Sequence, residues 1–125
     1  MSIPVELQSL GEAIAAYRFA YLLSSSPGKP PHAVAVVPVL EAGELVIDGT
    51  GRRTRENLRA QPQASLVWPP ESVGDYSLIV DGQAVLDGDS LRIRPGRAVL
   101  HRPAPRPGPA TTGGCGSDCQ EIGLP

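Results

Sequence analysis

The feature that most limits how this chain can fold is a series of short apolar segments, bounded by Gly, Pro, Asp or Ser. Runs of this length and composition indicate strands, and the breaks between them indicate turns. A closed or nearly closed antiparallel barrel leaves few strand edges exposed, so the sequence predicts a mainly β, six-stranded antiparallel barrel. The expected strands are Phe19–Leu23, His32–Leu40, Leu45–Asp48, Ala64–Trp68, Tyr76–Leu86 and Leu91–Arg94.

Three of these segments carry further information. Asp87-Gly88-Asp89 is a strong signal for a tight hairpin between the last two strands. Asp81-Gly82 falls inside a long strand, where it indicates a β-bulge instead of a strand end. The run His32–Leu40 has no polar alternation, so both of its faces should be covered. We expect the barrel interior on one face and a cofactor or a partner subunit on the other.

Two helices and a tail complete the expected organisation. Val5–Tyr17 has apolar residues at helical spacing, and Thr54–Gln61 reads as a short helix between the third and fourth strands, stopped by Pro62. The apolar face of the first helix is formed by Leu7, Leu10, Ile14 and Tyr17. From residue 104 onward Pro, Gly, Thr and Ser dominate, so we expect a barrel domain over residues 1–103 and an extended tail over 104–125.

The bulk composition excludes some classes of protein. With 125 residues the chain has the size of one domain, and 41% hydrophobic residues with a net charge of −2 exclude a disordered or nucleic-acid-coating polypeptide. Aromatic residues make up only 4%, so burial against a second copy of the chain is expected to add apolar contact. No targeting signal is visible and the longest apolar stretch, Ala33–Leu40, is too short to cross a bilayer. We therefore expect a cytoplasmic homodimer that contacts no membrane.

The segment "DGTGRRTRENL", residues 48–58, is the strongest candidate for a binding site. A strand ends, two glycines allow a close turn, and a helix begins among three arginines. Free N–H groups at a helix start attract anions, and the guanidinium groups of Arg52, Arg53 and Arg55 with the Thr54 hydroxyl can bind phosphate oxygens. In the alternative interpretation Thr54 only caps the helix and the arginines form a solvated face. A dinucleotide fingerprint is excluded because its third glycine is missing.

Three stretches together resemble the pyridoxamine 5′-phosphate oxidase-like split-barrel family: "PHAVAVVPV", "GELVIDGTGRRTRENLRAQPQASLVW" and "YSLIVDGQAVL". The resemblance covers about Val5 to Pro103, and its most specific part is "TRENLRAQPQASL". It implies a split barrel that pairs as a homodimer, with FMN or a deazaflavin in the groove between subunits. In that family the block after the third strand holds the phosphate and the second strand lines the ring system.

The same resemblance implies cofactor-binding residues by position. Asn57 joins the three arginines and Thr54 as a candidate near the phosphate. Beside the ring it places either His32, Val34 and Val36 or the alternate residues Ala33 and Ala35, and the sequence leaves this parity open. Trp68 is placed near the ring, with a core residue at the end of the barrel as the alternative.

This chain also departs from the oxidases proper. It lacks the longer C-terminal region whose Arg, His and Trp residues help to hold substrate and cofactor, and its second strand lacks their basic residues. We therefore expect an FMN-dependent oxidoreductase that acts on another small molecule. The compact basic cluster suits one terminal phosphate, which favours FMN over the deazaflavin F420. The alternatives are a non-catalytic flavin or deazaflavin carrier and a haem-binding protein with His32 or His101 as axial ligand.

Cys115 and Cys119 stand four positions apart in "GGCGSDC". Two thiolates can form half of a metal site that His101 or a second subunit completes, or they can form a reversible disulfide. The third interpretation is two reduced thiols without a function in the tail.

Overall fold

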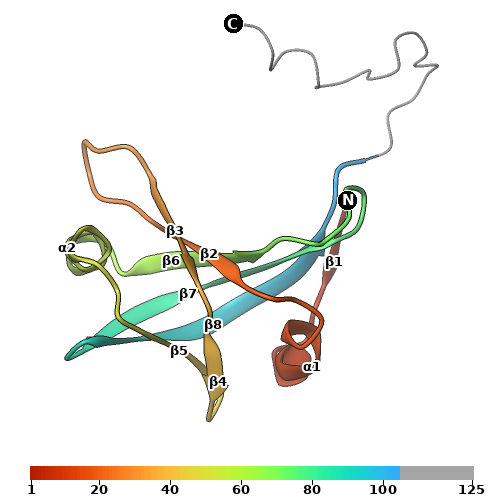
Figure 1. Ribbon diagram of the computed structural model, residues 1–125, viewed down its shortest axis with the longest axis horizontal. Coiled ribbons are helices and arrows are strands. Elements are labelled where there is room, and N and C mark those ends of the chain that lie inside the picture. Colours follow the sequence, from red (N-terminus) through yellow and green to blue (C-terminus); the bar gives the residue numbers. More distant parts are fainter. Residues whose placement is uncertain (105–125) are drawn as a thin grey trace, which may run out of the picture.

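A computed structural model describes residues 1–104 of the chain, in which eight strands form one antiparallel sheet (Figure 1). The strands are β1 (Ser2–Pro4), β2 (Ala20–Ser24), β3 (His32–Val36), β4 (Val39–Glu41), β5 (Glu44–Asp48), β6 (Gln63–Trp68), β7 (Ser77–Asp87) and β8 (Ser90–His101). The helices are the short 3-10 turn η1 (Leu7–Ser9), α1 (Leu10–Ile14) and α2 (Arg52–Ala60). No helix in this part of the chain is long and apolar enough to cross a membrane.

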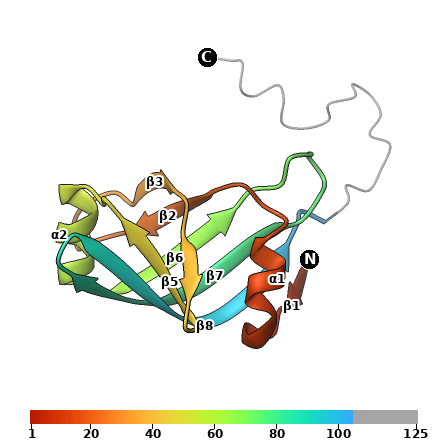
Figure 2. The same ribbon diagram turned by 60° about the horizontal axis from the view of Figure 1, so that its bottom comes forward.

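The order of the strands explains why the sheet curls. The sheet runs β3-β2-β6-β7-β8-β5-β4, and β1 is added along β8. β3 and β4 stand at opposite ends of this order, yet only Val37 and Pro38 separate them in the sequence. The three residue steps from Val36 to Val39 span at most about 11 Å, so the two ends of the sheet have to approach each other. Figure 2 shows the resulting curled half-barrel, which confirms the expected mainly β split-barrel fold.

The expected strand over residues 32–40 is corrected by the structure into two strands, β3 and β4. Pro38 has no N–H to donate to a ladder, so pairing stops on either side of it. The continuous apolar run concealed this break. The structure also adds β1, which together with the divided strand gives eight strands where six were expected. The last strand, β8, extends to His101, beyond the expected end at Arg94.

The expected bulge in the long hairpin is confirmed. Asp81 pairs with Arg97 while Gly82 pairs with Pro95, so the extra residue is Gly96 in β8. The bulge lets the ladder continue past Pro95-Gly96, which is why β8 is longer than the sequence indicated. The expected tight turn is also present, since β7 ends at Asp87 and β8 begins at Ser90.

The N-terminal helix is shorter than the predicted Val5–Tyr17 and begins as a 3-10 turn. Leu10 is buried, and Ile14 and Tyr17 pack against the core, whereas Leu7 is exposed. The Tyr17 hydroxyl donates to the carbonyl oxygen of Tyr76 at 2.8 Å. Burial, with a smaller contribution from Asp75, raises the pKa of Tyr17. The second helix, α2, starts two residues before the predicted position and ends before Pro62.

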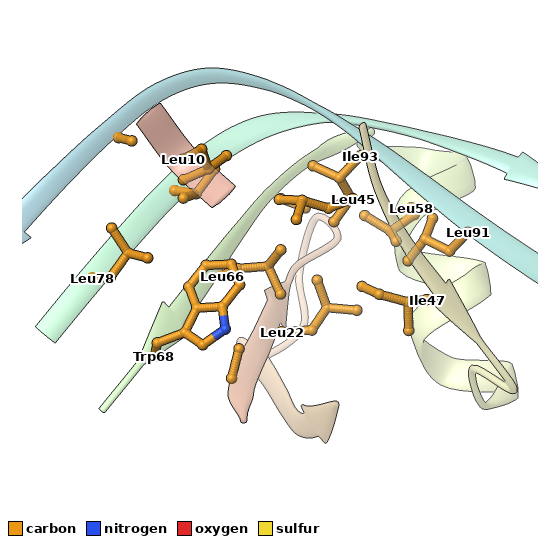
Figure 3. Packing of buried hydrophobic residues seen from close by; sticks show 14 residues of the cluster. Leu10, Leu22, Leu45, Ile47, Leu58, Leu66, Trp68, Leu78, Leu91 and Ile93 are labelled. Carbon is orange, nitrogen blue, oxygen red and sulfur yellow. The ribbon is translucent and has the colours of Figure 1, made fainter. Parts of the chain in front are cut away.

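The core fills the concave side of the sheet and consists mostly of leucine and isoleucine (Figure 3). Alternate residues of the strands point inward, as in β2, where Ala20, Leu22 and Ser24 are buried. Trp68 is the largest fully buried side chain and lies toward one end of the cluster, while Leu58 of α2 lies beside Leu91 of β8. The buried face of α2 thus holds the helix against the sheet, where it packs on β2 and β7.

Candidate functional site

A groove of about 650 Å³ lies in the split between the two ends of the sheet. On one side it is lined by residues 34–37 at the free edge of β3, together with Phe19. On the other side it is lined by Val39 of β4, by the end of β5 and by the loop that leads into α2, residues 46–51. A volume of this size is in the range of pockets that bind small molecules or cofactors.

The backbone edge of β3 forms one wall of the groove. Four consecutive residues line it, so the wall is the edge of the strand and includes side chains of both faces. Within the sheet β3 pairs only with β2, so its other edge carries N–H and C=O groups that no strand of the described sheet takes up. Such an edge can hydrogen-bond the polar rim of a planar ring system, while the valine side chains contact its face.

The far end of the groove is the N-terminus of α2. Gly51 is the N-cap in an extended conformation and no side chain caps the helix. The first helical hydrogen bond runs from the Arg55 N–H to the Gly51 carbonyl at 3.2 Å, so the N–H groups of residues 52–54 have no acceptor within the helix. The first turn also contains no acidic residue. These features are favourable for an anion at this end of the groove.

Orphaned polar groups gather at this point. In the part of the chain that the structure describes, three buried side-chain polar atoms have no hydrogen-bond partner: Thr50 Oγ1, Thr54 Oγ1 and Arg55 Nη1. All three fall within one six-residue stretch around the start of α2. Buried polar groups in proteins are nearly always paired, and each unpaired one costs about 1–3 kcal/mol. The stretch is therefore the place where a ligand with several acceptor oxygens gains most.

The three predicted arginines surround the helix start without lining the groove itself. Arg52 is exposed, and its Nε lies 3.6 Å from Oε2 of Glu56. The Nη2 of Arg53 donates to the carbonyl oxygen of Pro30 at 3.5 Å. Arg55 turns toward the hairpin between β7 and β8, where it donates to the carbonyl of Gly88. Arg52 and Arg53 directly follow the groove-lining Gly51, so their backbone N–H groups lie at the end of the groove.

Asn57 has partners within the protein. It is buried, its Nδ2 donates to the Ser24 hydroxyl at 3.1 Å, and its Oδ1 accepts from the Ser26 hydroxyl at 3.0 Å. These bonds tie α2 to the end of β2 and to the loop that follows. The structure thus gives Asn57 a role in fixing the position of the helix.

The register of β3 with β2 shows which of its side chains face the core. Leu22 faces Val34 and Ala20 faces Val36 across the ladder, so Val34 and Val36 point toward the core. The alternate residues, Ala33 and Ala35, are exposed on the outer face, so only one face of β3 is covered within a single chain. Among these residues the groove is lined by Val34, Ala35 and Val36.

The remaining predicted residues lie away from the groove. His32 starts β3 opposite Ser24 and is half-buried. Trp68 is 1% exposed and belongs to the core, the alternative that the sequence offered for it. Cys115 and Cys119 lie outside the described residues. Among residues 1–104 no three His, Cys, Asp or Glu side chains come together as metal ligands.

Several groove residues had no signal in the sequence. Phe19, Val39 and Val46 reach the site only because the sheet curls. Thr50 lies inside the predicted loop, but the sequence does not show that its hydroxyl is buried without a hydrogen-bond partner among the described residues. Asp48 lines the groove as well, and its carboxylate accepts a hydrogen bond from Ser90.

A second hollow of about 580 Å³ lies on the outer face of the sheet, around the bulge. Its charged groups are already paired within the chain. Asp81 accepts from Ser65 at 2.6 Å and from Arg97 at 3.2 Å, and Arg94 pairs with Glu44 at 2.9 Å. The groove at α2, where polar groups are unpaired, is therefore the better candidate site.

Comparisons with known proteins agree with this architecture. Two mycobacterial relatives, Mb0449c of Mycobacterium bovis and MT0457 of Mycobacterium tuberculosis, are each 39% identical, with 97% of this chain and 96% of theirs covered. Neither name states an activity, and no family model matches the chain.

Among solved structures, the chain is similar to a Listeria innocua protein described as "Putative Pyridoxamine 5'-phosphate oxidase", with a TM-score of 0.63 at 17% identity over 75% of this chain and 96% of that one. A FAD-binding protein of Mesorhizobium loti gives a TM-score of 0.61 at 16% identity, covering 80% and 95%. An F420 reductase gives 0.58 at 14% identity, covering 70% and 94%.

Proposed function

Since the chain belongs to the family of the two mycobacterial proteins and, by its fold, to the pyridoxamine 5′-phosphate oxidase-like split-barrel proteins, we propose that it binds FMN in the groove and is an FMN-dependent oxidoreductase. The observation that carries this proposal is the uncapped N-terminus of α2 at the end of the groove, where the Thr50 hydroxyl lines the groove and has no hydrogen-bond partner among the described residues. FMN has a terminal phosphate and a planar ring, and the groove offers an anion site and a strand edge for these two parts. The flavin supplies the hydride chemistry, and the protein binds and orients it.

The residues that would hold the phosphate follow from the geometry at α2. The Thr50 and Thr54 hydroxyls and the N–H groups of residues 52–54 supply donors, and the guanidinium groups of Arg52 and Arg53 supply charge. The ring would lie along residues 34–37, with its polar rim toward the backbone edge of β3. Val46 and Ile47 form the opposite apolar wall.

FMN fits this site better than the alternatives. One helix N-terminus with two nearby hydroxyls suits a single phosphate, whereas F420 carries further charge along its tail. A haem would require an axial ligand, and neither histidine lines the groove. His101 lies on β8 with its Nδ1 3.1 Å from the Ser2 hydroxyl.

A variant of Arg53 tests the phosphate site. Arg53→Ala is expected to weaken FMN binding by about 1.5–3 kcal/mol, the loss of one charge-assisted hydrogen bond, which corresponds to roughly 10- to 150-fold in Kd. Arg59→Ala is the matched control, because Arg59 is an exposed arginine in the last turn of the same helix. Equal affinities of both variants and the unaltered protein for FMN, measured by fluorescence titration, would place the phosphate elsewhere.

We also propose that the protein forms a homodimer through the outer face of β2, β3 and β6. Outward positions here carry Tyr21, Leu23, Ala33, Ala35 and Val67, all at least partly exposed and none charged. A second copy would cover them and, because β3 also borders the groove, would stand beside the cofactor.

Light scattering of the eluted protein tests the dimer. We expect twice the chain mass for the unaltered protein and for Val73→Arg, a change on a fully exposed loop. Ala35→Arg places a charge on the outer face of β3 and is expected to give the mass of one chain. A monomeric unaltered protein would contradict the proposal, as would a dimer that survives Ala35→Arg.

A further inference from the structure

The end of the groove away from α2 has a different chemistry from the end described above. Arg53, at the start of α2, reaches the Pro30 carbonyl just before β3, so the phosphate end lies beside the beginning of β3. Val37 follows the other end of that strand. Here the groove is lined by Phe19, Val37 and Val39. Val37 and Val39 are 69% and 54% exposed, so apolar surface is open to contact beyond the edge of β3.

The described residues that line the groove also carry a negative charge and no positive charge. Among the described residues that line it, Asp48 has the sole ionisable side chain, and this carboxylate accepts a hydrogen bond from the Ser90 hydroxyl. No lysine, arginine or histidine side chain within residues 1–104 lines the groove. An anionic substrate would therefore lose its hydration without gaining a cationic partner, which is unfavourable. An apolar molecule loses little hydration and gains contact with three apolar side chains.

On the basis of the proposed function, we propose that the substrate of this site is an uncharged, mainly apolar small molecule that binds against Phe19, Val37 and Val39, beside the bound flavin. Phosphorylated and carboxylated compounds are excluded from the same position by the absence of a counter-charge. This preference is a property of the groove wall, so it can be measured by binding alone.

The experiment compares two probes by calorimetry, the neutral naphthoquinone menadione and the anionic pyridoxine 5′-phosphate. Both are titrated into the protein loaded with FMN and into the protein without added FMN, and the FMN content of each sample is read from its absorption spectrum. Menadione is expected to bind at least tenfold more tightly than pyridoxine 5′-phosphate.

Two lysine variants locate the binding position. Val39→Lys is expected to weaken menadione binding by at least tenfold, because the ammonium group takes the place of apolar contact. Val73→Lys is the matched control, since Val73 is a fully exposed valine outside the groove. Val37→Lys provides the second test if Val39→Lys does not fold, as judged by circular dichroism.

The outcomes separate this inference from the proposed function. Tighter or equal binding of pyridoxine 5′-phosphate to the protein loaded with FMN, whose phosphate site is filled, would overturn it, as would menadione affinity that is unchanged in the folded groove variant. A change in molecular mass on Val39→Lys would identify Val39 as a subunit contact and also overturn it. If FMN does not bind but the cofactor-free protein keeps the preference for menadione and its loss in the groove variant, the proposed function fails and the assignment of an apolar ligand stands.

Discussion

Gly82→Ala is expected to lower the free energy of unfolding by roughly 3 kcal/mol, an unusually large effect for the addition of one methyl group. A Cβ at this position would collide with the carbonyl oxygen of Arg94 and would lie 2.9 Å from Cγ2 of Ile93. The first of these atoms belongs to the backbone of the neighbouring strand and cannot rotate away. Because the bulge fixes how β7 and β8 face each other, relief would require a shift of the ladder itself.

Gly96→Ala is the matched control on the other strand of the same bulge. An added Cβ there would have its nearest contact at 3.8 Å, an ordinary van der Waals distance. Its free energy of unfolding should stay within about 0.5 kcal/mol of the unaltered protein. Urea denaturation followed by circular dichroism measures both values. Equal stability of the two variants would show that β7 and β8 do not approach each other as described.

Trp68→Ala is expected to cost about 3–5 kcal/mol, because it removes the largest fully buried side chain and leaves a cavity among leucines. A protein of this size has about 5–15 kcal/mol of stability in total, so the variant would lose a large share of it. The change in the urea midpoint, again followed by circular dichroism, measures the effect.

Trp68→Phe separates a core role from a cofactor contact. The smaller ring leaves part of the cavity and should destabilise the protein less than alanine does. Because Trp68 does not line the groove, FMN affinity should be unchanged in this variant. A folded Trp68→Phe protein that has lost FMN binding would place the indole at the ring after all.

The strands were predictable because their signals are local. Burial at the start of β8 follows the sequence pattern, since Leu91 and Ile93 are buried and alternate with two arginines, and Asp87-Gly88-Asp89 marked its hairpin correctly. The exception is the run Ala33–Leu40, which contains Pro38 but no polar residue. The hydrophobicity of the run indicates that it is buried, but it does not indicate where pairing stops because Pro38 lacks an N–H group. Two strands at opposite ends of the sheet were therefore predicted as one.

The site was predictable only in part. The glycines before α2 and the arginines in its first turn correctly indicated a strand-to-helix turn with free N–H groups. Whether the amide of Asn57 faces a ligand or the protein depends on Ser24 and Ser26, which lie some thirty positions earlier. Likewise, Phe19 and Val39 meet in the groove through the curl of the sheet, for which no short stretch of sequence carries a signal.

The most direct test of the proposed function is a titration of the purified protein with FMN, followed by absorption and fluorescence, with F420 and haem titrated in parallel. We expect FMN to bind with a perturbed ring spectrum, to saturate at one molecule per chain, and to bind more weakly to Arg53→Ala. Unperturbed FMN spectra throughout the titration, or a spectral change with haem or F420 alone, would contradict the assignment of this groove to FMN.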